Sequence, residues 1–421
     1  MQEMIDIANK IKQAGGTLYL VGGAIRDRFL NLPVTDEDYC VTGLEKEEFQ
    51  SIFPEAKIQG KDFPVFVLNQ KEIALARRER KIGMGHKQFD FIVSSTITIE
   101  EDLVRRDVTI NSMAQNVLTG ELIDPYNGKE DIEKRILRKT SEAFSEDPLR
   151  VYRVARFAAT LNFTVETETI KAMTLLKEEL STLSKERVFV EFRKALLSDQ
   201  PSKFFEVLNQ SEILEVHFEE IANLIGKIQP EKYHPEGDSY IHTMQVVDKS
   251  TQLTQDAKIR FSCLVHDLGK GVTKKEILPH HYGHDEKGVD LVQTLGNRLG
   301  VPNEWMKCGK IACKWHMKAG IFEKMTPNKQ VEMIESVSKS ILGLEGLQIV
   351  VACDKNRESE TLQETFNHII FTELGRKCLE TINGNFIQKK YQDLSGKTLG
   401  EKLHEERVNW VKSIMKGNKF R

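Results

Sequence analysis

The chain lacks the features that would tie it to a membrane or to an oxidising compartment. It has six cysteines, and none of them forms a Cys-x-x-Cys pair. This usage predicts reduced, mostly buried thiols in a cytosolic protein. No run of about 18 apolar residues occurs, so no transmembrane helix is expected. The start, Met1–Asp6, has no basic region followed by an apolar run, so no signal peptide is expected either. We therefore predict a cytoplasmic protein without a membrane partner.

A strong charge of one sign is also absent. The formal net charge is −3 over 421 residues, so any nucleic-acid surface must be a local basic patch. No internal repeat or low-complexity tract is found. The chain is too long for one hydrophobic core, and about two to four domains are expected.

Hydrophobic periodicity divides the chain into a mixed first part and a helical remainder. Residues 3–14 have apolar positions at helical spacing, and Gly15-Gly16 ends that helix. The patterns that follow predict helices over 44–53 and 99–114, a hairpin of strands over 63–68 and 72–78, and a mobile loop over 79–90. Later helices are predicted over 146–161, 168–179, 185–198 and 202–209. The fold class is therefore α+β, with an α/β head followed by all-α parts.

The stretch Leu18–Asp27 has the pattern of an apolar strand, a glycine turn at Gly22-Gly23 and a short helix. A second strand is expected to place Asp36 and Asp38 on one face, because strand side chains alternate. Glycines let a backbone approach phosphates closely, and paired carboxylates suit Mg²⁺. Either motif alone is more often a turn or a solvated loop. Together they indicate a nucleoside triphosphate beside two metal ions.

This pattern resembles the signature of the DNA polymerase β-like nucleotidyltransferases, and more narrowly the bacterial class II tRNA nucleotidyltransferase and poly(A) polymerase family. The resemblance continues in order through RRDVTINSMAQN (105–116), DPYNG (124–128), EDPLRVYRVARFAA (146–159) and ERVFVEFRKALL (186–197). It covers about the first half of the chain. It implies a polymerase β-like head followed by a helical neck and body.

The resemblance also assigns roles to individual residues. Asp36 and Asp38 would be catalytic and would bind Mg²⁺. The residues expected to hold the nucleotide are Gly22, Gly23, Arg26, Asp27, Arg106, Asp107, Asn111, Asp147, Arg150, Arg153 and Arg156. The loop 79–90 would help to switch from C to A addition, with an inert surface loop as the alternative.

A row of charged residues recurs every three positions at Asp147, Arg150, Arg153 and Arg156, which forms a ridge along one helix. The row could be a surface ion pair or a contact with RNA backbone. The resemblance implies instead that Asp147 and Arg150 hydrogen-bond the Watson–Crick edge of the incoming base. A carboxylate accepts from an exocyclic amino group and a guanidinium donates. Such a pair would accept CTP and ATP and reject UTP and GTP.

The second half of the chain carries an ordered series of histidines and aspartates. Imidazole and carboxylate form a ligand set for transition metals that leaves room for an activated water. The series resembles the HD phosphohydrolase superfamily, which implies that His242, His266, Asp267 and Asp354 bind a divalent metal, Ni²⁺ or Mg²⁺. The auxiliary groups would be Lys270, His281, His284 and His316. Hydrolysis of a 2′,3′-cyclic phosphate or a phosphomonoester is expected, with a degraded structural domain as the alternative.

Together the two sites indicate one function. The combination resembles CCA-adding enzymes of the gamma-proteobacterial type, which implies addition or repair of the 3′-terminal CCA of tRNA with CTP and ATP, by a monomer or homodimer. The alternatives are an A-adding enzyme or poly(A) polymerase, an HD phosphohydrolase whose first half binds RNA, and a noncatalytic RNA-binding protein. The expected domains are a head (1–140), a neck and body (141–225), an HD domain (226–360) and a helical tail (361–421). The role of residues 1–15 stays open.

Overall fold

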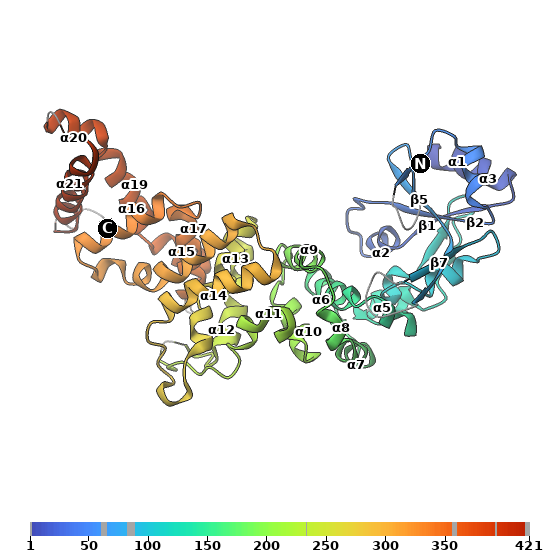
Figure 1. Ribbon diagram of the computed structural model, residues 1–421, viewed down its shortest axis with the longest axis horizontal. Coiled ribbons are helices and arrows are strands. Elements are labelled where there is room, and N and C mark those ends of the chain that lie inside the picture. Colours follow the sequence, from blue (N-terminus) through green and yellow to red (C-terminus); the bar gives the residue numbers. More distant parts are fainter. Residues whose placement is uncertain are drawn as a thin grey trace. The chain divides into compact units, whose positions relative to one another are not determined.

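The computed structural model describes residues 2–59, 65–81, 89–232, 234–355, 360–391 and 394–416 (Figure 1). The chain forms two compact units. The first comprises Met1–Phe192 and Lys203–Val216, and the second comprises Arg193–Ser202 and His217–Arg421. The first unit contains the mixed sheet and the second is built from helices.

A seven-stranded sheet in the order β3-β4-β5-β2-β1-β8-β9 organises the first unit. Its strands are β1 (Thr17–Val21), β2 (Asp38–Thr42), β3 (Lys57–Gln59), β4 (Val65–Leu68), β5 (Lys71–Leu75), β8 (Ala114–Asn116) and β9 (Leu122–Ile123). The strand β1 lies between β2 and β8 and is antiparallel to both, whereas β2 runs parallel to β5. The predicted hairpin is confirmed, since β4 and β5 pair antiparallel.

The first helix belongs to the core of this unit. The helix α1 (Gln2–Gln13) buries Met4, Ile7, Ala8 and Ile11 on one face. This face packs against β1 and against α3 (Lys46–Ile52), and the helix ends just before Gly15, whose φ of 93° suits glycine (Figure 1). Residues 1–15, whose role the sequence left open, therefore help to form the core of the head.

Two local predictions for the head are wrong. The strand β2 begins at Asp38, so Asp36 lies in the segment before it. The predicted helix over 99–114 is instead α4 (Ile99–Leu103), a 3₁₀ turn at Thr109–Asn111 (η1) and the strand β8. Ala114, at the end of the predicted helix, instead begins the strand that pairs with β1. Apolar periodicity within a segment does not register pairing with a strand far away in the sequence.

The predicted loop over 79–90 is partly strand. The strands β6 (Arg77–Lys81) and β7 (Phe89–Val93) pair antiparallel as a separate ribbon. Residues 79–81 and 89–90 of the predicted loop therefore belong to strands, and residues 82–88 lie outside the described residues.

The predicted helices after residue 140 are confirmed. The elements of this part are η2 (Glu142–Glu146), α6 (Leu149–Leu161), β11 (Thr164–Val165), α7 (Thr167–Leu175), α8 (Lys177–Leu180), α9 (Lys185–Leu196), α10 (Ser202–Gln210) and α11 (Leu214–Ala222). The head also contains α2 (Gly23–Phe29), which follows β1, and α5 (Gly128–Lys134) and β10 (Ile136–Leu137), which precede η2. The helix α6 carries Arg150, Arg153 and Arg156, but Asp147 lies before it at the end of η2, so the prediction of one helical row that includes Asp147 is wrong. Val151, Val154 and Ala155 of α6 are fully buried. Burial of this stripe fixes which way the three arginines face.

The second unit is a stack of helices around one apolar core. Its elements are α12 (Ser239–Leu253), α13 (Ala257–Val265), η3 (Leu268–Val272), η4 (Lys275–Ile277), α14 (His284–Leu299), α15 (Asn303–Gly320), η5 (Phe322–Lys324), α16 (Pro327–Ser338), α17 (Gly343–Lys355), α18 (Leu362–His368), α19 (Phe371–Thr381), α20 (Gly384–Lys390) and α21 (Gly396–Lys416). The turn η3 packs directly on α14, because a Cβ at Gly269 would lie 1.9 Å from the carbonyl oxygen of His284. This close approach brings the start of α14 to the end of α13.

A buried arginine joins α13 to the end of α9 within the second unit. Arg260 is fully buried and donates to the carbonyl oxygens of Leu196 (3.0 Å), Ser198 (2.7 Å) and Thr254 (2.9 Å). The last carbonyls of a helix have no partner within the helix. Arg260 supplies that partner for α9.

All six cysteines are free and buried, as predicted. Within the part of the chain that the structure describes, no single helix has both the length and the apolar character needed to span a membrane. The pair α16 and α17, bent by 111°, meets that test together.

Candidate active sites

The first candidate site lies where β1 ends. Val21 pairs with Asp38 in register, so the end of β1 brings the glycine turn beside the first residue of β2. Gly22 has a φ of 74°, a conformation that suits glycine, and a Cβ there would lie 3.0 Å from Nη1 of Arg106. The turn therefore needs glycine for its backbone shape and for the approach of the arginine.

A cavity of about 620 Å³ opens at this point. It brings together most of the residues predicted to bind the nucleotide and the metals: Gly22, Gly23, Arg26, Asp36, Asp38, Arg106, Asp107, Asn111, Asp147, Arg150, Arg153 and Arg156. Asp27 does not line it, but holds Arg26 through an ion pair of 2.8 Å. The head and the helix α6 thus contribute to one cavity within the first unit.

The carboxylates of Asp36 and Asp38 are exposed in this cavity. Desolvation and the like charges of Asp36 and Glu72 raise the pKa of Asp38, although Arg106 opposes the shift. Two neighbouring carboxylates that disfavour each other's charge are suited to a divalent cation. The donor set of oxygens therefore fits Mg²⁺.

Most of the arginines in the cavity already have carboxylate or amide partners. Arg26 donates to Oδ1 of Asn111 (2.7 Å), and Arg153 donates to Oδ2 of Asp107 (2.7 Å). Asp107 is buried, yet Arg153 and Asn111 hold its pKa well below the ordinary value. Asp107 and Asn111 therefore act as a buried support that fixes the direction of two guanidinium groups.

Asp147 and Arg150 also have protein partners. Oδ1 of Asp147 accepts from the backbone N–H of Leu149 (3.0 Å), and its Oδ2 pairs with Arg187 (3.0 Å). Arg150 is buried and donates to the carbonyl oxygens of Arg105 (2.5 Å) and Ala143. These bonds fix the orientation of the Arg150 guanidinium at the wall of the cavity.

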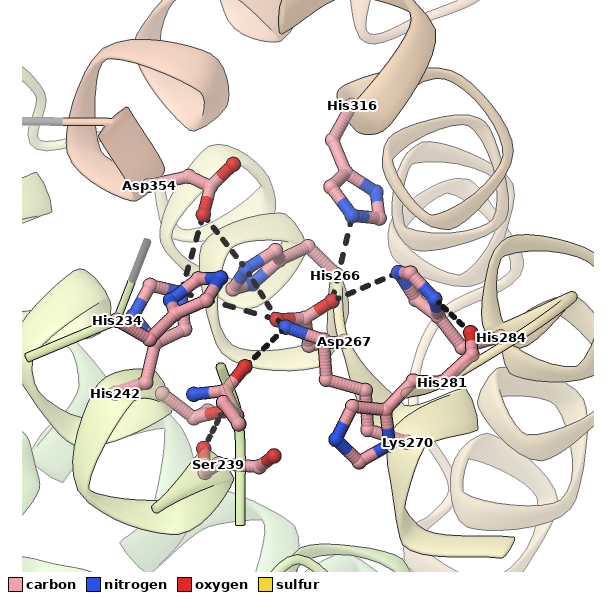
Figure 2. A network of polar contacts seen from close by, with 12 residues as sticks. His234, Ser239, His242, His266, Asp267, Lys270, His281, His284, His316 and Asp354 are labelled. Carbon is pink, nitrogen blue, oxygen red and sulfur yellow. Dashed lines mark hydrogen bonds and ion pairs between the residues drawn. The ribbon is translucent and has the colours of Figure 1, made fainter. Parts of the chain in front are cut away.

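The second candidate site is a buried cluster around Asp267 at the end of α13 (Figure 2). Its Oδ2 lies 3.3 Å from Nε2 of His266 and 3.7 Å from Nε2 of His242. Oδ1 of Asp354 lies 3.0 Å from the same atom of His242. On the other side, Oδ1 of Asp267 lies 3.3 Å from Nε2 of both His284 and His316. Asp267 is therefore shared by two groups of ligand atoms.

The atoms of this cluster fit a metal. Among the buried atoms that the structure describes, Oδ1 of Asp267 and the Nε2 atoms of His266, His284 and His316 make no hydrogen bond, whereas Oδ2 of Asp267 pairs with Lys270. The Nδ1 atoms of these rings face backbone carbonyls, at 2.7 Å for His266 and His284 and at 3.0 Å for His316. Such contacts leave Nε2 as the ligand atom. Buried polar atoms without partners are costly, and a divalent cation would satisfy them together.

The electrostatics of the cluster agree with this fit. Burial opposes the charged form of His266, but the carboxylates of Asp267 and Asp354 raise its pKa to about 10. Lys270, with Nζ 2.5 Å from Oδ2 of Asp267, and His266 hold the pKa of that carboxyl well below its ordinary value despite burial. The carboxylates of Asp267 and Asp354 thus favour positive charge at this centre, which a proton on His266 or a divalent cation can supply.

Comparison with known families separates the chain into three matched regions. Residues 18–138 match the Poly A polymerase head domain, residues 162–225 match the probable RNA and SrmB-binding site of polymerase A, and residues 239–339 match the HD domain. The chain therefore combines a head domain of the poly(A) polymerase type with an HD domain. The head domain contains the glycine turn and Asp36 and Asp38, and the HD domain contains His242, His266 and Asp267.

Solved structures share this fold over nearly the whole chain. The Bacillus stearothermophilus CCA-adding enzyme in complex with CTP is 20% identical, with a TM-score of 0.56, covering 100% of this chain and 94% of that chain. A CCA-adding enzyme complexed with ATP is 19% identical, with a TM-score of 0.63, covering 97% and 90%. A tRNA nucleotidyltransferase complexed with a primer tRNA and an incoming ATP analog is 22% identical, with a TM-score of 0.58, covering 88% and 98%. At these identities the likeness shows the fold of the nucleotidyltransferase.

Several residues of the two sites were not predicted from the sequence. Arg77, Arg105, Phe157 and Arg187 also line the nucleotide cavity. Arg187 lies in the segment ERVFVEFRKALL. This segment contributed to the resemblance to the family, but it did not indicate a role for Arg187. Its pairing with Asp147 depends on the packing of α9 against α6.

Glu236 is the residue missed in the HD cluster of this nucleotidyltransferase. Its Oε1 lies 2.6 Å from Nδ1 of His242 and 3.1 Å from Nδ1 of His234. A carboxylate on Nδ1 presents Nε2 to the centre. A carboxylate two residues after His234, within the histidine-rich region, was the feature of the sequence that could have indicated a role for Glu236.

His281 differs from the other auxiliary histidines. Its Nδ1 lies 2.8 Å from the hydroxyl of Thr273 and its Nε2 lies 3.0 Å from the carbonyl oxygen of Ile228. Both ring nitrogens thus have protein partners, and burial and Lys270 lower the pKa of His281 to about 4. The neutral ring holds the loop before α14 in place.

Proposed function

We propose that the chain adds or repairs the 3′-terminal CCA of tRNA, with CTP and ATP as substrates and no nucleic-acid template. The observation that carries this proposal is one cavity that combines Asp36 and Asp38 with Asp147 and Arg150. Complexes of structurally similar enzymes with CTP, with ATP, and with a primer tRNA and an ATP analog support it. We also place the enzyme in the cytoplasm, where its free cysteines would stay reduced.

In this proposal the RNA 3′-hydroxyl attacks the α-phosphate of the nucleotide, and pyrophosphate leaves. Asp36 and Asp38 would hold Mg²⁺, which supplies charge neutralisation and activation of the hydroxyl. Arg26 and Arg106 bind the triphosphate, and Asp27 and Asn111 orient Arg26. Preorganised guanidinium groups stabilise developing charge without rearranging during the reaction.

The choice of base rests on Asp147 and Arg150. Asp147 accepts from the exocyclic amino group that cytosine and adenine share, and Arg150 donates to the ring edge. The two backbone carbonyls that accept from Arg150 hold its guanidinium in place at the cavity wall. Arg187, which pairs with Asp147, orients the carboxylate.

An extension assay tests this proposal directly. A tRNA lacking CCA is incubated with CTP alone, ATP alone and both nucleotides, and the products are resolved to one nucleotide. A CCA-adding enzyme adds two C residues with CTP, completes CCA with both, and stops. Addition of A alone to a tRNA ending in CC indicates an A-adding enzyme, and continued A addition indicates a poly(A) polymerase.

A second activity is proposed for the HD cluster, namely hydrolysis of a 2′,3′-cyclic phosphate or a phosphomonoester at an RNA end. The unbonded buried atoms around Asp267 favour it over a purely structural domain. His242, His266, Asp267 and Asp354 would hold one divalent cation, and Asp267, His284 and His316 a second, which would supply an activated water. Lys270 would bind the phosphate. Release of inorganic phosphate from adenosine 2′-monophosphate, with Ni²⁺ or Mg²⁺ added, tests the activity.

A further inference from the structure

An exposed pair of rings lies beside the HD cluster. The rings of His280 and Tyr282 are stacked, with centroids 5.6 Å apart and an interplanar angle of 24°. Tyr282 is 70% exposed and His280 is also exposed, so neither ring packs in the core. A large aromatic side chain held in water by a partner ring offers a free π-face.

The backbone that carries this pair is anchored on both sides of Tyr282. His281 is fixed by Thr273 and by the carbonyl oxygen of Ile228, as described above. The Nζ atom of Lys287, one turn into α14, donates to the carbonyl oxygen of Tyr282 (3.2 Å). The ring is therefore presented from a fixed backbone, which lowers the entropy lost when a ligand stacks on it.

The same loop also positions the metal cluster. The carbonyl oxygen of His281 accepts from Nδ1 of His284, whose Nε2 faces Asp267 (Figure 2). Tyr282 is two residues from His284, so their Cα atoms are at most about 7.6 Å apart. The stacked rings are therefore carried by the same short segment as a histidine of the cluster.

We propose that His280 and Tyr282 form a stacking site for the nucleobase of the RNA end whose phosphate is hydrolysed at the HD cluster. The proposal rests on the hydrolase activity proposed above and names its substrate class, a nucleotide rather than a simple phosphate ester. Stacking on an aromatic ring tolerates every base, because each base has a π-face. The site therefore selects for a base without selecting which base.

Two phosphomonoesters test the site. Adenosine 2′-monophosphate carries a base, and glycerol 2-phosphate does not. Tyr282→Ala should raise KM for adenosine 2′-monophosphate by about 5- to 100-fold with little change in kcat. It should leave the hydrolysis of glycerol 2-phosphate unchanged. Tyr282→Phe should retain the wild-type KM, His280→Ala should give an intermediate increase, and Ile341→Ala, at an exposed position away from the loop, should change neither substrate.

An equal loss on both substrates would mean that the loop only positions His284, and an unchanged KM would mean that no base stacks there; either result overturns the inference. If the wild-type enzyme hydrolyses neither ester, the proposed hydrolase fails, and the stacking site is then judged by binding alone. The adenine proton resonances of adenosine 2′-monophosphate should shift upfield with wild type and shift less with Tyr282→Ala. No difference between these two proteins would refute the stacking site as well.

Discussion

The two sites differ in how far their charged side chains are exposed and in whether those side chains have partners within the protein. In the nucleotide cavity, Asp36 and Asp38 face solvent, and most arginines are paired with carboxylates or amides of the protein. In the HD cluster, Oδ1 of Asp267 and Nε2 of three histidines are buried without hydrogen-bond partners. In the proposed function we therefore expect metal to enter the first site together with the triphosphate, and the second site to keep its ion between turnovers.

The strongest test of this comparison is to disable each site alone. Asp38→Asn should lower nucleotide addition by about 10³-fold or more and spare phosphate release, because it removes a ligand from only one centre. Asp267→Asn should do the reverse. Both activities are measured on the same preparations, and circular dichroism checks folding. Loss of both activities in either variant would contradict two independent centres.

Metal affinity separates the sites further. Glu236→Gln removes the carboxylate that faces Nδ1 of His242, and the affinity of the HD cluster for a divalent cation should fall by about 10- to 100-fold. Titration calorimetry with Ni²⁺ measures this. Glu231→Gln, at an exposed position in the preceding segment, is the matched control. An unchanged affinity would show that Glu236 does not orient His242.

Base choice is the next largest effect, and it belongs to the nucleotide cavity alone. Arg150→Ala should reduce the ratio of kcat/KM for CTP and ATP over UTP and GTP by about tenfold or more, since the base edge loses its donor. Extension rates with each nucleotide measure the ratio, and Arg150→Lys keeps the charge without the planar donor group. An unchanged ratio would contradict the hypothesis that Arg150 takes part in selecting the base.

A smaller effect concerns pH and a histidine outside the cluster. Burial and Arg298 lower the pKa of His217 to about 4, so the folded protein binds fewer protons than the unfolded chain between pH 6.5 and 4. Stability from this residue is therefore present above pH 6.5 and is lost as the pH falls. The free energy of unfolding should drop by about 1 kcal/mol between pH 7 and 5.5 through His217.

Urea titrations of wild type and His217→Gln at the two pH values measure this drop. His368→Gln, in which an exposed ring is replaced, should leave it intact. If His217→Gln retains the full pH dependence, the buried histidines of the metal cluster would be its source.

The sequence predicted those parts that depend on local pattern. The helices from residue 146 to 209 follow apolar periodicity, and the glycine turn, the aspartate pair and the His-Asp series are short motifs. The prediction for 99–114 was wrong because Ala114 pairs with β1, and the prediction for Asp36 was wrong because β2 begins only at Asp38. Arg187, Glu236 and the ring pair were missed because their roles arise from contacts that only the folded chain creates.

Arg260 has a consequence for how this enzyme could be divided. The fragment 1–225 would contain the head and all of α9 but would lack Arg260. The carbonyl oxygens of Leu196 and Ser198 would then lose the guanidinium that donates hydrogen bonds to them. The end of α9 would then fray into water. The HD domain therefore serves as the terminal cap of a helix that carries nucleotidyltransferase residues.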